Sequence, residues 1–415
     1  SFLAFTPGRI LNAQIPVSTG VEILILLTFL GASWQKRQVK SRLWQTPISI
    51  AFFCYGIFFL VEFFNPNMES LAGYILYLRK FLMFVFIYIL AYKLLDTKEK
   101  AKFFFQFWII ASFITAVYGC FQQWFGLLPF EMKTLMNDPH EYKLLFQGGI
   151  LRKFSILSDP VQFGILSGSM SLFSLMLAIH EKSRDLKIIY FFITAVLILG
   201  MLYSGTRTTI IILPSGIALY TLMSLHNKRS LIVLFSFFII SVGILFAPID
   251  SPALNRMRSS LNPKEASLDI RTVHRKYIQP YIYYHPLGGG MATSGVDGVR
   301  FNPNHVLSGF PPDSGFLKYA IETGWVGYAI VMAFFFIILI EAVNYYFLAV
   351  NEEIKLYMLA LTVTLFAITI SQYAQVALGQ LPMVIFFYAG LSLLKRLLEF
   401  SNDEPISELT LNIKQ

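Results

Sequence analysis

The sequence predicts an all-α, polytopic integral membrane protein with about 11–12 transmembrane helices and one large extracytoplasmic loop. Of its 415 residues, 56% are hydrophobic and only 14% are charged, and the mean hydropathy is +0.61. Soluble proteins average about 25% charged residues, so a chain this apolar is typical of a lipid environment. The apolar residues are gathered into runs of about 20, the length of helix that crosses a bilayer.

The links between these runs predict the topology. Basic residues follow the first, third, fifth and seventh runs, and Lys and Arg concentrate in links on the cytoplasmic side. The alternate links are therefore expected outside. By the same count the first residue lies outside, which predicts a further span upstream. The eleven runs are 18–34, 47–64, 73–94, 103–125, 158–179, 187–203, 207–225, 231–248, 315–347, 355–373 and 381–396.

We expect four parts along the chain. Residues 1–248 form an N-terminal transmembrane bundle of about eight spans, and residues 314–397 form a C-terminal bundle of about three. Between them lies an extracytoplasmic catalytic loop, 249–313, and residues 398–415 form a cytoplasmic tail. The loop is rich in Arg, His and Tyr and contains the run Gly288-Gly289-Gly290, a composition that a linker does not need. We therefore expect it to be folded and to carry the chemistry.

The composition also narrows the classes of ligand. The formal charge of +9 is no sign of nucleic acid, because excess Lys and Arg in membrane proteins mainly sets topology. Cys54 and Cys120 both lie in apolar runs, so we expect no disulfide framework. No set of His, Cys, Asp and Glu has the spacing of metal ligands, so we expect neither a metal nor another cofactor.

Several basic residues stand on the outer side, against the topological rule. Arg152 precedes a span, Arg207 ends the short turn Ser204-Gly205-Thr206-Arg207, and Arg79 and Lys80 lie just inside the outer end of a span. An ionisable group at membrane depth costs several kcal/mol unless it is paired or hydrated. Snorkelling to headgroups accounts for Arg79 and Lys80. The short turn leaves Arg207 little such freedom, so an anionic partner is expected there.

A second group of cations lies in the loop. Arg271, His274 and Arg275 stand at i, i+3 and i+4 in an expected helix over 264–281, so they share one face. That face is turned either to solvent or to the site. Guanidinium forks bind phosphate bidentately. Because the other outer arginines are expected on the same membrane surface, this convergence predicts a lipid-linked phosphate or diphosphate as the ligand.

Four polar stretches occur in order between residues 152 and 327. They are Arg152 with Phe154-Ser155 and Ser158-Asp159-Pro160; Ser204-Gly205-Thr206-Arg207; Arg271 followed by His285-Pro286-Leu287-Gly288-Gly289-Gly290; and Pro312-Asp313-Ser314-Gly315-Phe316 with Glu322-Thr323-Gly324-Trp325-Val326-Gly327. Together they resemble the motifs of the O-antigen ligase/polymerase superfamily, GT-C-like membrane glycosyltransferases that act on undecaprenyl-diphosphate-linked glycans. Family members commonly carry a His where this chain has Asp313, which favours the polymerase branch over the ligase branch.

The resemblance implies a multi-pass enzyme of the bacterial inner membrane that works without a metal on the outer, periplasmic face. It would transfer glycan repeat units as a polysaccharide (O-antigen or exopolysaccharide) polymerase; the alternative is an O-antigen ligase acting on lipid A-core or another acceptor. A lipid or solute transporter is disfavoured, because the centres of most spans carry no charge. The implied partners are the lipid-linked donor, a glycan or lipid acceptor, membrane lipids, and a chain-length regulator or other glycan-assembly proteins, with no nucleic acid.

Roles for individual residues follow from that chemistry. Arg152, Arg207, Arg271 and Arg275 are assigned to the diphosphate, in that order. The acceptor hydroxyl must lose a proton, and the two candidate catalytic bases are Asp313 and His305. A histidine has the better intrinsic pKa, about 6.5 against about 3.9 for an aspartate. Asp313 matches the family position and is preferred.

Each of these candidates also has an ordinary structural explanation. Asp313 follows two prolines and is expected to be the N-cap of the next span, a role that is compatible with catalysis. The ordinary explanation of His305 is a surface position on a flexible loop. Glu322 lies near the outer end of its span and is expected to pair with an arginine. His274 is expected to face the site together with Arg271 and Arg275, and the ordinary alternative is a solvent-facing helix surface. Tyr281 belongs to a tyrosine cluster that either stacks on sugar rings or forms an interfacial aromatic belt.

Overall fold

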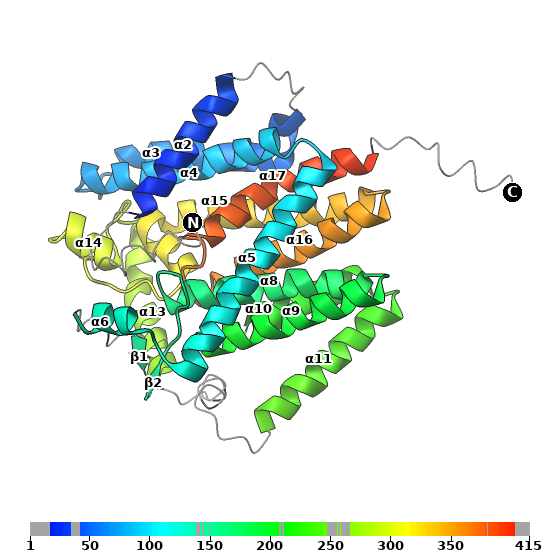
Figure 1. The fold of residues 1–415 in the computed structure, drawn as a ribbon. Coiled ribbons are helices and arrows are strands. Elements are labelled where there is room, and N and C mark those ends of the chain that lie inside the picture. Colours follow the sequence, from blue (N-terminus) through cyan, green and yellow to red (C-terminus); the bar gives the residue numbers. More distant parts are fainter. Residues whose placement is uncertain are drawn as a thin grey trace, which may run out of the picture.

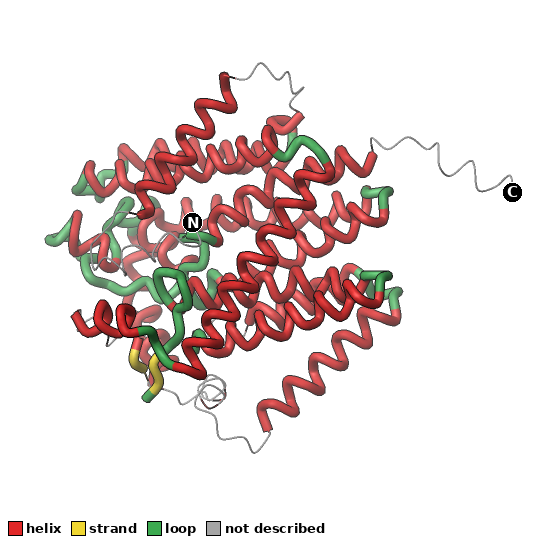
Figure 2. The backbone as a smooth tube through the Cα atoms, viewed as in Figure 1, coloured by secondary structure: helices red, strands yellow, loops and turns green. Residues whose placement is uncertain are grey.

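The computed structural model describes residues 17–402, apart from 35–41, 138–141, 143–144, 148, 207–208, 210, 247–254, 256–257, 259–265 and 380. Helices make up nearly all of the regular structure (Figure 2). In this part of the chain the only strands are a two-residue antiparallel pair, β1 (Phe146–Gln147) and β2 (Ile150–Leu151). The predicted fold class, an all-α polytopic membrane protein, is confirmed.

Every one of the predicted apolar runs contains a helix. Seven helices in the described residues are long and apolar enough to cross a membrane. They are α3 (Pro47–Val61) continued by η2 (Glu62–Phe64), α4 (Leu71–Leu94), α5 (Lys98–Phe125), α8 (Pro160–His180), α9 (Arg184–Tyr203), α15 (Gly315–Leu348) and α16 (Glu352–Ser371). The other runs contain α2 (Val17–Trp34), α10 (Ile212–Met223), α11 (Lys228–Phe246) and α17 (Met383–Asn402).

The count of seven is lower than the predicted 11–12 because four helices in the apolar runs are too short or too charged to cross a membrane by length and composition alone. The apolar parts of α2, α10 and α11 that the structure describes are shorter than 18 residues. The C-terminal part of α17 carries three charged side chains, Lys395, Arg396 and Glu399. The remaining elements are η1 (Arg42–Gln45), α6 (Pro129–Asn137), α13 (Ala266–Tyr284) and α14 (Gly295–Phe301).

Two helices form the centre of the bundle. Each candidate span contains an apolar stretch of 18 residues. The buried share of that stretch is 89% in α8 and 72% in α16, but only 22–44% in the other candidate spans. Small residues in α8 allow this packing: a Cβ added to Gly168 would approach the Met201 sulfur of α9 to 3.0 Å. The less buried helices therefore present apolar faces outward, as expected of helices against lipid.

The links gather at two ends of the bundle (Figure 1). We call the end with α6, α13 and α14 the loop end; the links after α3, α5, α9 and α16 also lie there. There the Asn65 side chain donates to the Leu287 carbonyl, and the Gly315 N–H donates to the Gln372 carbonyl. At the opposite end, Lys102 pairs with Glu353. The alternation of links is therefore as predicted, and which end faces outside stays a prediction.

The starts of two helices show how the loop end is fixed. Asp159 caps α8, because its Oδ1 accepts hydrogen bonds from the Val161 and Gln162 N–H groups at 2.8 and 3.0 Å. Ser314 caps α15, with its Oγ accepting from the Leu317 N–H at 3.0 Å. The expectation that Asp313 is this N-cap was therefore wrong. The hydroxyl one residue later makes the capping bond, which leaves Asp313 to another partner.

Candidate functional site

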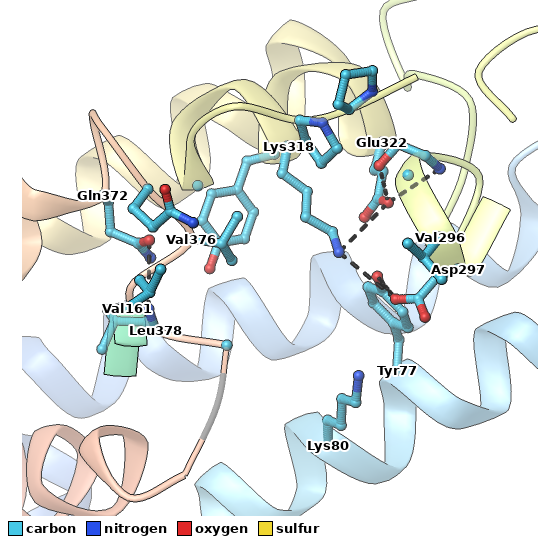
Figure 3. A pocket seen from close by; sticks show the side chains of 18 of the residues that line it. Tyr77, Lys80, Val161, Val296, Asp297, Lys318, Glu322, Gln372, Val376 and Leu378 are labelled. Carbon is cyan, nitrogen blue, oxygen red and sulfur yellow. Dashed lines mark hydrogen bonds and ion pairs between the residues drawn. The ribbon is translucent and has the colours of Figure 1, made fainter. Parts of the chain in front are cut away.

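A cavity of about 1010 Å³ lies at the loop end (Figure 3). Its walls come from α3, α4, α8, α14, α15 and the link after α16. Pockets for small ligands have volumes of roughly 300–1,000 Å³, so this cavity is large enough for a sugar with an attached phosphate group. The charged residues that line it are Lys80, Arg152, Asp159, Asp297, Lys318 and Glu322.

One wall carries a lysine–carboxylate cluster, which we define as Tyr77, Lys80, Asp297, Lys318 and Glu322. The Tyr77 hydroxyl donates to Asp297 Oδ2 at 2.8 Å, and Lys318 Nζ lies 3.8 Å from the same oxygen and 4.0 Å from Glu322 Oε1. Lys80 Nζ and Lys318 Nζ each lie 5.0 Å from the centre of the Tyr77 ring, within the range of cation–π attraction. In Figure 3, Lys318 projects between the two carboxylates.

Glu322 is the most enclosed member of this cluster. It is 3% exposed, and its Oε1 accepts a 2.6 Å hydrogen bond from the Ser294 hydroxyl. We expected Glu322 to pair with an arginine, but its cationic neighbour is Lys318, one turn earlier in α15. Two polar partners offset the desolvation of this carboxylate, so its position is fixed.

The backbone next to Glu322 explains why the two glycine-containing stretches, 285–290 and 322–327, occur together. α15 is broken at Gly324, whose φ and ψ are 65° and −172°. The loop 286–290 supplies the bonds that the helix loses there: the Gly289 and Gly290 N–H groups donate to the carbonyls of Ile321 and Glu322, both at 2.9 Å. A Cβ on Gly324 would lie 2.0 Å from the Pro286 oxygen. The two motifs thus interlock, and both glycine stretches serve this close backbone approach.

The link after α3 holds the same loop from the other side. Asn65 Nδ2 donates to the Leu287 carbonyl at 2.6 Å and to Glu62 Oε2 at 2.8 Å. Asn67 Nδ2 donates to the Gly288 carbonyl at 2.8 Å. The loop that carries Ser294 is therefore anchored to the N-terminal half of the chain, which gives the cluster a rigid support.

Arg152 lines the cavity from a different wall. Its Nε donates to the Ser204 carbonyl at 3.2 Å, and its Nη2 donates to the Thr206 hydroxyl at 2.8 Å. Arg152 and the serine turn were expected on the same membrane surface, and Arg152 contacts residues 204–206 of that turn; their role toward a diphosphate stays a prediction. Arg207 itself lies outside the described residues. The neighbouring Lys153 does not line the cavity, and burial lowers the pKa of its ammonium group.

The expected loop helix is present as α13. His274 Nδ1 lies 3.2 Å from Asp313 Oδ2. Arg275 Nη1 donates to the Tyr373 hydroxyl at 2.9 Å, and its guanidinium carbon lies 4.7 Å from that ring centre. Neither His274 nor Arg275 lines the cavity. Arg271 belongs to α13, but its side chain lies outside the described set.

Neither sequence-predicted base lines the cavity. Asp313 follows the lining residue Pro312 but contacts His274. His305 Nδ1 accepts a hydrogen bond from the Leu307 N–H at 3.1 Å. Burial lowers the pKa of His305, opposed by the charge of Glu69 and reinforced by His285. Their catalytic roles stay predictions.

Tyr281 also lies away from the cavity lining. Its ring stacks on His285 with the ring centres 4.0 Å apart, and burial raises the pKa of its hydroxyl. It packs against the small apolar cluster of Ile278, Leu307 and Ile321. Stacking on a sugar ring therefore stays a prediction, and the structure gives Tyr281 a role in packing the loop.

Sequence reasoning missed most of the lysine–carboxylate cluster. Tyr77, Asp297 and Lys318 lie on three elements, and Lys80 was explained by snorkelling. One signal was present: Lys318 and Glu322 stand at i and i+4, the spacing of an ion pair on a helix. Among the described residues, no group of three or more His, Cys, Asp or Glu side chains is arranged to hold a metal ion. Metal independence stays a prediction.

The comparison with known families can now be set beside this geometry. Residues 189–332 match the family model described as O-antigen ligase. The match confirms the predicted resemblance to the O-antigen ligase/polymerase superfamily. It covers about a third of the chain, from α9 through the glycine loop to the middle of α15, and includes Asp297, Lys318 and Glu322. No curated protein matches the chain.

This match indicates O-antigen ligase/polymerase-type activity in a multi-pass membrane protein, a glycosyltransferase-like enzyme. Arg152 lies before the matched residues, yet it reaches the 204–206 turn inside them. The family-like part of the chain and the preceding helices therefore build the cavity together.

Proposed function

We propose that this protein is a polysaccharide polymerase that transfers glycan repeat units from undecaprenyl diphosphate on the outer face of the bacterial inner membrane. The observation that carries the proposal is the loop-end cavity, whose walls present Arg152, Lys80 and Lys318. A diphosphate leaving group gains negative charge as its bond to the sugar breaks. Fixed cations beside that group stabilise the transition state more than the ground state.

In this proposal Arg152 faces the diphosphate. Two of its N–H groups are held by the 204–206 turn, so its guanidinium is oriented before substrate arrives. Such preorganisation avoids the cost of ordering a long side chain during the reaction. Arg207 and Arg271 are further proposed partners of the diphosphate by their place in the sequence. Arg275 is a weaker one, since its guanidinium rests on Tyr373.

The acceptor separates two candidate activities. Asp313-Ser314 stands where family members commonly carry His, which favours a polymerase acting on a growing glycan. A ligase acting on lipid A-core or another acceptor is the second candidate, favoured by the description of the matched family. A chain-length regulator and other glycan-assembly proteins are proposed partners of the polymerase.

The distribution of glycan lengths in cells lacking this protein tests the activity. A polymerase predicts that long chains disappear while single repeat units remain attached to their acceptor. A ligase predicts that all attached glycan disappears. Complementation with the wild-type gene should restore the original pattern. Unchanged glycans in the deletion strain would overturn both candidates.

Cysteine labelling tests the proposed orientation. Val306 at the loop end is 79% exposed, and Asn227 in the link between α10 and α11 is exposed at the opposite end. The native Cys54 is exposed on α3, so both variants need a background in which it is replaced by serine. A membrane-impermeant reagent on intact spheroplasts should label Val306→Cys and leave Asn227→Cys unlabelled. The reverse pattern would contradict an outward-facing site.

A further inference from the structure

We propose that Asp297 is the catalytic base of the transfer and accepts the proton of the attacking acceptor hydroxyl. This inference rests on the proposed function and adds to it the residue that activates the acceptor. Asp297 lies on α14 and lines the cavity, whereas the sequence-predicted bases Asp313 and His305 do not. A general base must come within hydrogen-bond reach of the proton that it removes, so geometry favours Asp297.

The contacts of Asp297 hold one carboxylate oxygen and leave the other available. Oδ2 accepts from the Tyr77 hydroxyl at 2.8 Å and lies 3.8 Å from Lys318 Nζ. No described residue donates a hydrogen bond to Oδ1. The side chain is 32% exposed, so a hydroxyl that enters the cavity can reach it. Tyr77 and Lys318 are thus positioning residues that orient the base.

The other carboxylates that line the cavity already accept hydrogen bonds from neighbouring protein groups. Both oxygens of Asp159 accept hydrogen bonds, Oδ1 from the first turn of α8 and Oδ2 from the Ser158 hydroxyl. Glu322 has only 4% of its side chain exposed, and its Oε1 accepts from Ser294. A buried carboxylate bound in this way cannot approach a sugar hydroxyl without breaking those bonds. Asp297 is therefore the lining carboxylate best placed to act.

The proposed step is balanced without any further reactant. The acceptor oxygen attacks the anomeric carbon of the donor and forms the new glycosidic bond. The bond between that carbon and the diphosphate oxygen breaks, and its electron pair leaves with undecaprenyl diphosphate. The hydroxyl proton passes to Asp297 Oδ1 and later to solvent. A carboxylate serves here because the proton is released late, when the new bond has already acidified the hydroxyl.

Transfer by the purified protein, with a lipid-linked glycan as donor, tests this role. Asp297→Asn keeps the shape and an acceptor for Tyr77 but removes the base. We expect kcat to fall about 100-fold or more, with the KM for the donor changed only a few-fold. The matched control is Asp185→Asn, the same change at an exposed carboxylate in the first turn of α9 at the opposite end of the bundle, which should stay within about threefold of wild type.

Chemical rescue separates a base from a structural residue. Asp297→Gly leaves space for a small carboxylate, so sodium formate should restore part of the rate, while sodium chloride at equal ionic strength should not. Asp297→Asn at wild-type rate, or a folded Asp297→Gly that formate fails to rescue, would overturn the assignment. Loss of transfer in Asp313→Asn together with normal transfer in Asp297→Asn would return the role to Asp313. No transfer by the wild-type protein would instead overturn the proposed function.

Discussion

Both ends of the bundle carry lysines, arginines and carboxylates, but at one end these charges form close ion pairs between helices and at the other end they border a cavity. At the opposite end, Lys98 and Lys102 both contact Glu353. Nearby, Glu399 accepts from the Tyr92 hydroxyl and pairs with Arg396, both at 2.9 Å. At the loop end, the lysine–carboxylate cluster and Arg152 border a cavity of about 1010 Å³. One end uses its charges to join helices, and the other leaves them facing an open volume.

The difference shows that a count of charged residues does not locate a site. Arg396 is 9% exposed, its Nε donates to the Tyr92 carbonyl and its guanidinium lies 3.6 Å from the Tyr92 ring centre. That geometry binds α17 to α4 and offers nothing to a ligand. Lys318, by contrast, is 3.8 and 4.0 Å from its two carboxylates, beyond direct hydrogen bonding. Charged side chains that line a cavity at such longer ion-pair distances are the feature that points to the loop end as the candidate site.

The largest expected effect concerns the scaffold of the loop end. Gly324→Ala places a Cβ 2.0 Å from the Pro286 oxygen, at a φ of 65° that favours glycine. We expect a loss of about 3 kcal/mol or more in the free energy of unfolding, seen as poor recovery and a lower melting temperature. Gly31→Ala is the control, since nothing lies within 4 Å of its added Cβ. Equal melting temperatures for the two variants would contradict the interlock.

The next effect compares one substitution at both ends. Arg152→Ala should lower transfer by about ten- to over a hundredfold, because a hydrogen bond to a charged group contributes roughly 1.5–3 kcal/mol. Arg152→Lys keeps the charge but loses the bidentate fork and should lie between alanine and wild type. The measurement is the initial rate of transfer, with melting temperature as a check on folding.

Arg396→Ala is the matched variant at the opposite end. It removes the cation beside Glu399, which keeps the Tyr92 hydroxyl and is 19% exposed, so we expect a loss of about 1–3 kcal/mol in stability. The rate per folded molecule should stay near that of wild type. If Arg396→Ala lowered the transfer rate as much as Arg152→Ala did, the functional difference between the two ends would be lost.

The sequence predicted the helices well and the site only in part. Apolar runs and basic links are local signals, so each expected run proved to contain a helix. Arg152 and the serine turn were expected only to share one membrane surface, and in the structure Arg152 contacts Ser204 and Thr206. The bond between Tyr77 and Asp297 joins residues 220 positions apart, and nothing local marks either of them. Which hydroxyl or carboxylate caps α15 was likewise decided by backbone geometry at Ser314.

A smaller effect is expected from pH at the loop end. Burial lowers the pKa of His305, so its neutral form is favoured in the folded protein. The stability it contributes is present above the unfolded pKa of about 6.5 and is lost as pH falls through the lower folded value. The melting temperature should therefore drop between pH 7.5 and 5. His305→Asn keeps an acceptor for the Leu307 N–H and should reduce that drop; an unchanged pH profile would contradict it.

Binding of undecaprenyl diphosphate to the purified protein tests the central claim most directly. A ligand that binds the folded state raises its stability by RT ln(1 + [L]/Kd), so the melting temperature should rise with lipid concentration. The uncharged alcohol undecaprenol is the control for the lipid tail. We predict a saturable rise with the diphosphate in wild type and Lys102→Ala, and little or none in Arg152→Ala. An equal rise with undecaprenol, or with the diphosphate in Arg152→Ala, would contradict a diphosphate site at the loop end.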